Sequence, residues 1–490
     1  MKSTKRILSC FLALVLSLVC LLPCFAAEQV TPVIMVTGMN AVPLVQKTDN
    51  GEEAVVWAPP ASAITSKIPK LIWPTIQVLF TRNWEKFMDK ALPLVNEVFE
   101  PVLMTELGKT LYDVVTDTGS GSYADNHSDS FLNQAGRDLG QRLADEFGAE
   151  NTYLFIYDWR RDLYEVAQEL NEFVESVKTE HNCDKVDFVS VSMGSVVTNC
   201  YLAQFGGDSL ENVTLVSPAF TGLSLLGDVF CGRVRFKEDA VYRILAQALS
   251  NQDTAKEEKL NKLFNILLKS HLMAPLFRFA DAMVDGTRER IFAETFVGSF
   301  GRMPGILELI PAAKYQEAKQ FLYHGEENAI TRITDRYFNE VGNRVEEIYK
   351  GIQQQGVKLA IVSCYGRQSA PVYENSDNQS DGTIDSYNTS GFATFAKHGT
   401  TLGSDYKQAV DCGHNHLSCD GIVDASTAMF PESTWIIKHF EHFNYEYEGN
   451  SCDLILWLTT RTEQATVFDN PEFPQFMEYS YQTHLLTPLK

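Results

Sequence analysis

The sequence is poor in positive charge and, beyond residues 1–26, lacks any apolar run long enough to span a membrane. Lysine and arginine number 41 against 63 aspartates and glutamates, which gives the 490 residues a formal net charge of −22. A chain this acidic repels nucleic acid and anionic membrane surfaces over a Debye length of about 8 Å. The composition therefore argues against a nucleic-acid partner, and we expect any transient contact with a membrane or lipid surface to be apolar.

Cysteine is sparse and unevenly spread. Three of the ten cysteines lie within residues 1–26, which leaves seven in the remainder of the chain. An odd number leaves at least one thiol unpaired. Cys412 and Cys419 are close enough in sequence to close a small loop if the protein reaches an oxidising compartment.

Residues 1–26 have the composition of a secretory signal peptide. Three basic residues precede an apolar run over residues 7–24, and two alanines come before the polar residue Glu28. A basic start, an apolar middle and small residues at the exit are typical of a signal that is cleaved. An uncleaved anchor is the alternative, because about 20 apolar residues can span a bilayer. We expect cleavage, and thus a secreted protein, extracellular, lumenal or at the cell surface according to the host.

Strand and helix patterns alternate in the first half of the chain. Apolar runs predict strands from Thr31 to Gly38 and at residues 152–159, 185–192 and 212–217. Residues 223–350 are helical in pattern, and strands resume at 357–366 and 434–440 before a final helix at 452–460. Strands that alternate with helices predict a mostly parallel central sheet with helices on both faces.

The long helical stretch divides the chain into parts. We predict a core built from residues 27–222 and 351–490, with a helical cap inserted at 223–350. Ligands of open α/β sheets bind beyond the carboxyl ends of the strands, so the cap would cover the active site. The cap is rich in Leu, Ile, Phe and Met, which suits an acyl chain because each buried CH₂ contributes about 0.8 kcal/mol. The same residues would also serve simply to pack the cap on the core.

A tight strand-to-helix junction is predicted at residues 190–194, Ser-Val-Ser-Met-Gly. A nucleophile elbow has the pattern G-x-S-x-G at such a junction, and here Ser190 replaces the first Gly. The turn lifts the Ser192 hydroxyl clear of the sheet and aims the Met193 backbone N–H at developing negative charge. The pattern predicts an α/β-hydrolase fold with Ser192 as nucleophile, and a plain turn of small residues is the alternative.

The other members of a triad have competing candidates. In this fold the order is Ser, acid, His, so both partners should follow the cap. Asp420 and Asp381 each head an Asp-Gly turn, and we favour Asp420 because it leads directly into the segment that carries the histidine. His439 falls inside the last predicted strand and His442 just beyond it. We favour His442, because a base in a loop can swing toward the serine.

Taken together, these motifs resemble the lecithin:cholesterol acyltransferase family, which includes lysosomal phospholipase A2 and phospholipid:diacylglycerol acyltransferase. The similar segments, in chain order, are P-V-I-M-V-T-G from Pro32, Y-D-W-R from Tyr157, S-M-G from Ser192, P-G-I-L-E-L-I-P from Pro304, D-G-I-V from Asp420 and H-F-N from His442.

The resemblance implies a triad of Ser192, Asp420 and His442 that forms an acyl-enzyme. It also implies two oxyanion donors, the backbone N–H groups of Met193 and of Met39. The sequence departs from the family's pattern in having Thr37, Met39, Ser190 and Val191. It also lacks cysteine from residue 27 to 182, and with it the family's lid disulfide.

The sequence thus predicts a serine esterase or lipase that needs no metal and no cofactor, acting on carboxylic esters and most readily on phospholipid or acylglycerol acyl esters. Whether the acyl group passes to water or to an alcohol stays open. The alternative is a lipid-binding protein of the same fold that has lost its chemistry, and the four departures favour that interpretation.

A short segment also invites a metal-site interpretation. Residues 411–420 hold two cysteines and two histidines, and zinc uses such ligands. The spacing matches no common zinc site, and an exported protein favours a disulfide here. We therefore expect no metal.

Overall fold

The computed structural model describes residues 30–47, 53–57, 59, 65–125, 131–132, 134–250, 252–442 and 444–490. The predicted signal peptide at residues 1–26 lies outside them. Pro32–Lys490 form one compact unit. Among the described residues, no helix is both long enough and apolar enough to cross a membrane.

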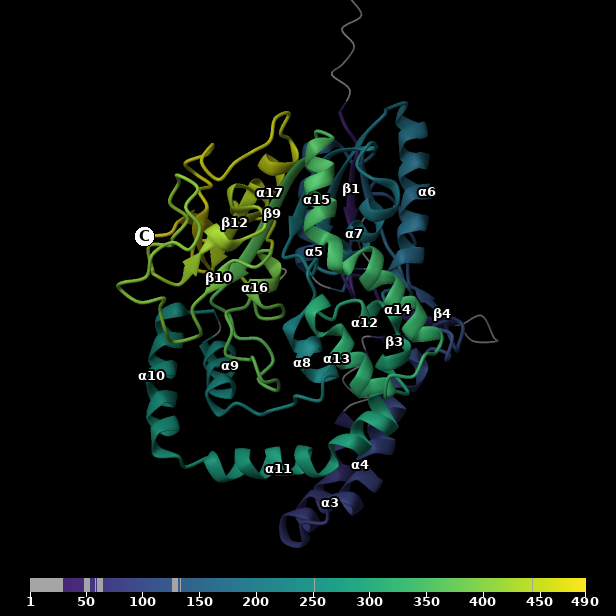
Figure 1. The fold of residues 1–490 in the computed structure, drawn as a ribbon, viewed down its shortest axis with the longest axis vertical. Helices are drawn as coiled ribbons and strands as arrows, with labels where there is room; N and C mark the ends of the chain where they lie inside the picture. The colour runs from purple at the N-terminus through teal and green to yellow at the C-terminus, as the bar shows by residue number, and fades with distance from the viewer. Residues whose placement is uncertain are drawn as a thin grey trace, which may run out of the picture. The chain divides into compact units, whose positions relative to one another are not determined.

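A nine-stranded sheet runs through this unit in the order β14-β13-β12-β9-β8-β7-β1-β6-β5 (Figure 1). Its strands are β1 Val33–Val36, β5 Gly121–Ser122, β6 Thr152–Phe155, β7 Val186–Val191, β8 Leu210–Val216, β9 Lys358–Tyr365, β12 Thr434–Lys438, β13 Phe476–Ser480 and β14 Leu485–Pro488. From β6 to β13 all neighbours pair in parallel, and only the edge strands β5 and β14 pair antiparallel. This is the mostly parallel sheet that the sequence predicts.

Helices cover both faces of the sheet. Along β1, Ile34 and Val36 join one hydrophobic core, while Val33 and Met35 join the other. The first core includes residues of α6 Leu163–His181, α7 Gly194–Phe205 and α15 Val345–Gln354, and the second includes residues of α5 Gln134–Phe147 and α17 Ser451–Thr459. Strands buried on both faces are near-continuous apolar runs, which is why these strands could be predicted from the sequence.

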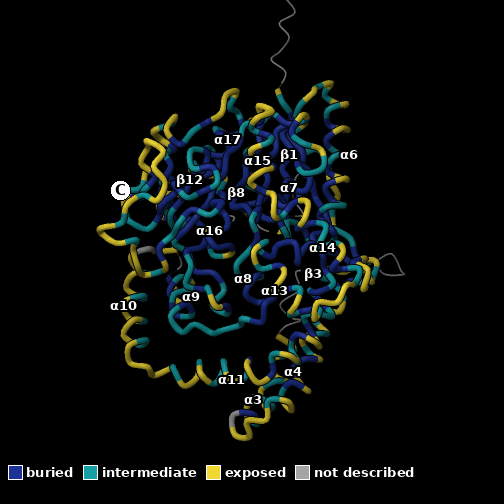
Figure 2. The backbone as a smooth tube through the Cα atoms, in the orientation of Figure 1, coloured by how far each residue is buried: buried dark blue, intermediate teal, exposed yellow. Residues whose placement is uncertain are grey.

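The chain between β8 and β9 is helical. It contains α8 Ser224–Phe230, α9 Glu238–Ser250, α10 Thr254–Ser270, α11 Ala274–Ile291, η2 Phe292–Phe296, η3 Phe300–Arg302, α12 Pro304–Leu307, α13 Ala312–Tyr323, α14 Ala329–Glu340 and η4 Gly342–Arg344. The helix α4 Trp84–Phe99, from the first part of the chain, packs against α3 Ile68–Thr81 and against α11, where the tilted rings of Trp84 and Phe279 have centroids 4.8 Å apart. Much of α3, α10 and α11 is exposed (Figure 2).

Several short helices and strands were not predicted from the sequence. A three-stranded antiparallel sheet has the order β3-β2-β4, with β2 Leu44–Lys47, β3 Glu53–Trp57 and β4 Val114–Thr116. Small elements also occupy the predicted polar loop and its surroundings: η1 Glu100–Val102, α16 Ser386–Thr389, β10 Thr394–Phe395, β11 Val423–Asp424, η5 Ala425–Thr427 and η6 Pro431–Ser433. The prediction that the sheet ends at residue 440 is wrong, because β13 and β14 extend it beyond α17.

Candidate active site

Ser192 lies on a strained turn between β7 and α7. Its backbone φ is 52°, a left-handed value that costs a residue other than glycine on the order of 1–3 kcal/mol. The turn is fixed at both ends: the Ser192 N–H donates to the Val216 carbonyl (3.0 Å), and the Ser192 carbonyl accepts from the N–H groups of Ser195 (3.0 Å) and Ala219 (3.1 Å). A nucleophile elbow has this strand-turn-helix geometry.

Two small residues allow the turn. A Cβ at Gly194 would lie 2.2 Å from the Val36 carbonyl oxygen and 2.6 Å from that of Thr37, so the helix can approach the end of β1 only with glycine there. Ser190 stands where the pattern has its first glycine, and its hydroxyl lies 2.7 Å from that of Thr198 in α7. The extra atom is therefore hydrogen-bonded, which explains why serine is tolerated.

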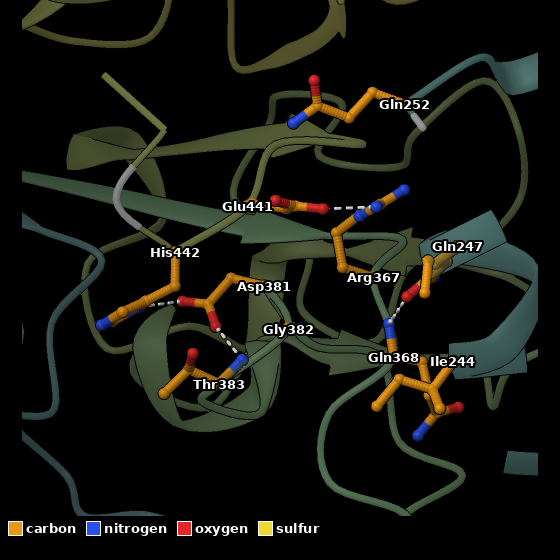
Figure 3. A pocket seen from close by; sticks show the side chains of 11 residues that line it. Ile244, Gln247, Gln252, Arg367, Gln368, Asp381, Gly382, Thr383, Glu441 and His442 are labelled. Carbon is orange, nitrogen blue, oxygen red and sulfur yellow. Dashed lines mark hydrogen bonds and ion pairs between the residues drawn. The ribbon is translucent and has the colours of Figure 1, made fainter. Parts of the chain in front are cut away.

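His442 bridges the serine to a buried carboxylate. Its Nε2 lies 3.0 Å from Ser192 Oγ. Its Nδ1 lies 2.7 Å from Asp381 Oδ2, a contact that Figure 3 shows. The other carboxylate oxygen of Asp381 accepts from the backbone N–H groups of Thr383 (2.9 Å) and Ile384 (2.7 Å). Because a carboxylate only accepts, Nδ1 carries the proton and Nε2 is left to accept from the hydroxyl. This is the arrangement of nucleophile, base and orienting acid.

The prediction that Asp420 orients His442 is wrong, because Asp381 takes that place. Asp420 accepts hydrogen bonds from Tyr365 (2.7 Å) and Ser418 (2.7 Å) and pairs with Lys438 (2.9 Å). Burial opposes its ionisation, yet these hydrogen bonds and the ion pair hold the pKa of Asp420 below its usual value.

Pairing near the end of β9 explains the exchange. Arg367, two residues beyond β9, forms bridges with Ser380 and Asp381, which return the long loop to the carboxyl end of the strand. Asp420 was favoured because it is closer to His442 in sequence, but closeness in sequence does not predict how the long loop folds back to β9. The competing histidine, His439, lies 3.0 Å from Glu478 Oε1, so the structure places His442 rather than His439 against the serine.

The two predicted oxyanion donors belong to segments that meet at the elbow. Met193 is the N-cap residue of α7, where helix N–H groups point toward negative charge. Met39 lies in the turn after β1, and the close approach of Gly194 to the end of β1 brings the two segments together. Their role as donors stays a prediction.

Two segments that suggested the family resemblance are structural in this chain. Arg160 is fully buried, pairs with Asp158 through Nε (2.9 Å) and a terminal nitrogen (2.6 Å), and donates to the Val102 carbonyl (3.1 Å). A Cβ at Gly305 would lie 2.2 Å from the Trp159 carbonyl oxygen and 3.1 Å from Met193 Cε. The helix α12 thus rests directly on the loop after β6 and on the side chain of Met193, which follows Ser192.

A cavity of about 620 Å³ adjoins Asp381 and His442. It is lined by Ile244, Gln247, Ala248, Gln252, Arg367, Gln368, Asp381, Gly382, Thr383, Glu441 and His442 (Figure 3). Arg367 pairs with Glu441 and with Glu257 (3.0 Å). Arg367 and Gln368 belong to no motif in the sequence, although they lie just after the parallel strand β9, where such sheets bind ligands.

Comparison with known proteins adds little. No family model matches the sequence, and no curated protein matches it. A solved structure described as "The crystal structure of Tle4-Tli4 complex" is similar over 88% of this chain and 99% of that one, at 10% identity and a TM-score of 0.37. The α/β-hydrolase fold is recognised from the chain's own sheet and elbow.

Proposed function

We propose that this chain is a serine hydrolase that cleaves carboxylic esters with Ser192, His442 and Asp381. The observation that carries the proposal is the continuous pair of hydrogen bonds from hydroxyl to imidazole (3.0 Å) and from imidazole to carboxylate (2.7 Å). A serine hydroxyl is a weak nucleophile until a neighbouring base takes its proton, and the base works only if a third group orients it. Both conditions are met, by three residues that are 61 or more positions apart in sequence.

The reaction follows from these contacts. His442 takes the hydroxyl proton as Ser192 Oγ bonds to the acyl carbon, and the carbonyl oxygen becomes an oxyanion. The C–O bond to the leaving alcohol then breaks, and the alcohol takes the proton from His442, which leaves an acyl-enzyme. Water or a second alcohol repeats the steps in reverse. Asp381 holds the imidazole tautomer throughout and stabilises the imidazolium without taking the proton.

The oxyanion needs donors, and we propose the backbone N–H groups of Met193 and Met39. Removing one such donor costs on the order of 3 kcal/mol of transition-state stabilisation. The donors are backbone groups, so the side-chain departure at Met39 from the lecithin:cholesterol acyltransferase pattern does not remove the N–H.

Lipid acyl esters are the substrate class that we propose within this activity. The helices α3, α10 and α11 expose apolar side chains, among them Ile72, Trp73, Phe80, Leu263, Ile266 and Leu276, and Leu272 is exposed in the connection between α10 and α11. In an acidic protein, apolar side chains rather than charges have to make any contact with a lipid surface. The resemblance to the acyltransferase family supports the same substrates, and the signal-like segment at residues 1–26 supports a secreted enzyme.

A panel of p-nitrophenyl esters from acetate to long acyl chains tests both levels of the proposal. The purified protein should hydrolyse them, Ser192→Ala should not, and Ser404→Ala, at an exposed serine, serves as a matched control. Equal rates for acetate and long chains would remove lipid as the substrate class but leave an esterase. Turnover that persists in Ser192→Ala would remove the proposed function itself.

The acceptor is a separate question. Incubation with phospholipid, with and without an added long-chain alcohol, distinguishes the two outcomes by product. Free fatty acid alone indicates a hydrolase, whereas a new ester that forms only when the alcohol is present indicates an acyltransferase.

A further inference from the structure

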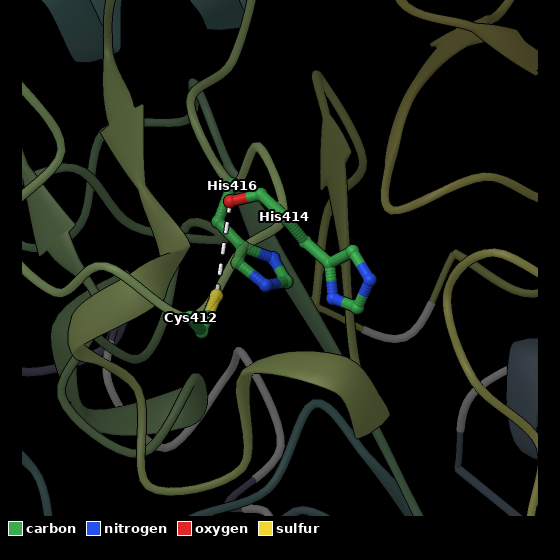
Figure 4. A group of neighbouring side chains, drawn as sticks. All are labelled: Cys412, His414 and His416. Carbon is green, nitrogen blue, oxygen red and sulfur yellow. Dashed lines mark hydrogen bonds between the residues drawn. The ribbon is translucent and has the colours of Figure 1, made fainter.

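Three metal-ligating side chains gather in the loop before β11. Cys412, His414 and His416 each offer a ligand atom, and these atoms all lie within 4.8 Å of one another (Figure 4). Cys412 and His414 are exposed, while His416 is fully buried. None of the three belongs to the proposed triad.

The residues alternate along the chain, and the backbone explains why they meet. The His416 carbonyl accepts from the Ala425 N–H and the Ser418 N–H donates to the Val423 carbonyl, both at 2.9 Å. Residues 416–418 are thereby paired with β11. Residues 412–414 form a bend with Gly413 at φ 82°, and this bend brings Cys412 and His414 beside His416, at a spacing that fits no common zinc motif.

The hydrogen bonds of His416 fix its tautomer. Nδ1 lies 2.7 Å from Gln475 Oε1, and the amide nitrogen of Gln475 donates to the carbonyls of Pro431 (2.7 Å) and Thr434 (3.2 Å). The amide oxygen must therefore accept, so Nδ1 of His416 carries the proton. Its Nε2 is left with a lone pair, is buried, and has no hydrogen-bond partner among the described residues.

The buried Nε2 of His416, an acceptor without a hydrogen-bond partner among the described residues, is positioned to bind a ligand. An imidazole whose Nδ1–H is held by an amide or carboxylate and whose Nε2 is free is the usual form of a metal-binding histidine with its supporting hydrogen bond. A second support lies nearby, since His414 Nδ1 is 3.1 Å from the Glu432 carboxylate. Buried polar groups in proteins are nearly always paired, so the orphaned nitrogen is itself evidence of a missing partner.

We propose that Cys412, His414 and His416 bind a zinc ion. One thiolate and two imidazoles match the sulfur and nitrogen ligands of zinc and disfavour magnesium and calcium, which take oxygen ligands. Cys412 releases its thiol proton to solvent as the Zn–S bond forms.

The proposed ion is structural. It would join the loop at 412–416 to η6, through Glu432, and to the start of β13, through Gln475. The expected Cys412–Cys419 disulfide is not formed in the structure, where both thiols are free and exposed. Cys412 is thus available to a metal, and Cys419, outside the cluster, provides a control of the same residue type in the same loop.

Metal binding is measured directly on the purified full chain, stripped with chelator and kept reduced. Titration with Zn²⁺ against a chromophoric chelator should give one ion per chain and raise the melting temperature. Cys412→Ser and His414→Gln change exposed residues and should each weaken binding at least tenfold, while Cys419→Ser and His324→Gln should not. Co²⁺ in place of zinc should give a sulfur-to-cobalt charge-transfer band that Cys412→Ser abolishes.

Three results would overturn the zinc site. One is a wild-type chain that takes up no zinc when reduced. The second is binding that Cys419→Ser weakens as much as Cys412→Ser does. The third is a Cys412–Cys419 disulfide in peptide maps of protein purified in the presence of zinc. Ester hydrolysis does not enter these readouts, so the zinc site and the proposed function fail or stand separately.

Discussion

His442 is joined to Asp381 twice. Its backbone N–H donates to the Asp381 carbonyl (2.7 Å), and its imidazole Nδ1 donates to the carboxylate Oδ2 (2.7 Å). The main-chain bond positions the loop after β12, and the side-chain bond orients the ring. The loop that carries the acid is thereby attached to the loop that carries the base, whatever substrate is present.

Replacement of each candidate acid by asparagine shows which of the two carboxylates orients His442. Asp381→Asn should lower kcat by a factor on the order of 10⁴, because an amide in place of the carboxylate favours the wrong imidazole tautomer, as it does in serine proteases. Asp420→Asn should leave kcat within a few-fold, since its partners are Tyr365, Ser418 and Lys438. Steady-state ester hydrolysis measures both variants, and the reverse ranking would restore Asp420 as the acid.

Alanine substitution should change the unfolding free energy in opposite directions at Gly194, in the elbow, and at Gly351, in α15. Gly194→Ala should destabilise the protein by about 3 kcal/mol or more, at or above the upper end of overpacking costs, because the new Cβ would meet backbone oxygens that cannot move aside. Gly351→Ala, in α15 with no atom within 4 Å of the added Cβ, should stabilise it by about 0.5–1 kcal/mol. Urea unfolding curves give both values, and equal midpoints for the two variants would contradict the packing described for Gly194.

Alanine substitution at the neighbouring residues Arg160 and Arg161 should lower the unfolding free energy by unequal amounts. Arg160 is buried with Asp158, so Arg160→Ala leaves an unpaired carboxylate and should cost about 3–5 kcal/mol of unfolding free energy. Arg161 pairs with Glu169 at the surface, with side chains 32% and 48% exposed, so Arg161→Ala should cost at most about 1 kcal/mol. The same unfolding measurement compares them. A loss at position 161 as large as at 160 would show that burial does not govern the difference.

Asp187 predicts a pH dependence of stability. Burial raises its pKa from 3.8 to about 7, against hydrogen bonds from Asn212 that lower it. Between those two values the folded chain holds a proton that the unfolded chain has lost, so the stabilising contribution is complete below pH 3.8 and is lost as the pH rises toward 7. The slope for one proton is at most about 1.36 kcal/mol per pH unit.

Asp187→Asn should remove that slope, and the exposed Asp208→Asn should leave it unchanged. Unfolding free energies at intervals from pH 4 to 7 measure it as the difference from wild type. A difference that does not vary with pH would show that Asp187 titrates alike in the folded and unfolded chains.

The sequence predicted best what is local and periodic. The strands buried on both faces are apolar runs, and the elbow is a five-residue pattern in which Ser192 and Met193 take their places from neighbouring residues. His442 follows from its position just after a strand. The short strands β2 to β4, with partly exposed patterns of three to five residues, gave no comparable signal.

Contacts between residues far apart in the sequence could not be predicted. Asp381 and Asp420 head similar Asp-Gly turns, and only the pairing of Arg367 with Ser380 and Asp381 decides which carboxylate meets the imidazole. Likewise, spacing alone argued against a metal at residues 411–420. The orphaned Nε2 of His416 becomes visible only when Gln475, 59 residues away, fixes the tautomer.

The most direct test of the catalytic account is the site at which a fluorophosphonate reacts. The account predicts that the folded wild-type protein forms one adduct, that peptide mass mapping places it on Ser192, and that His442→Gln slows its formation severely. A well-folded wild-type chain that stays unlabelled, or an adduct on another serine, would contradict it.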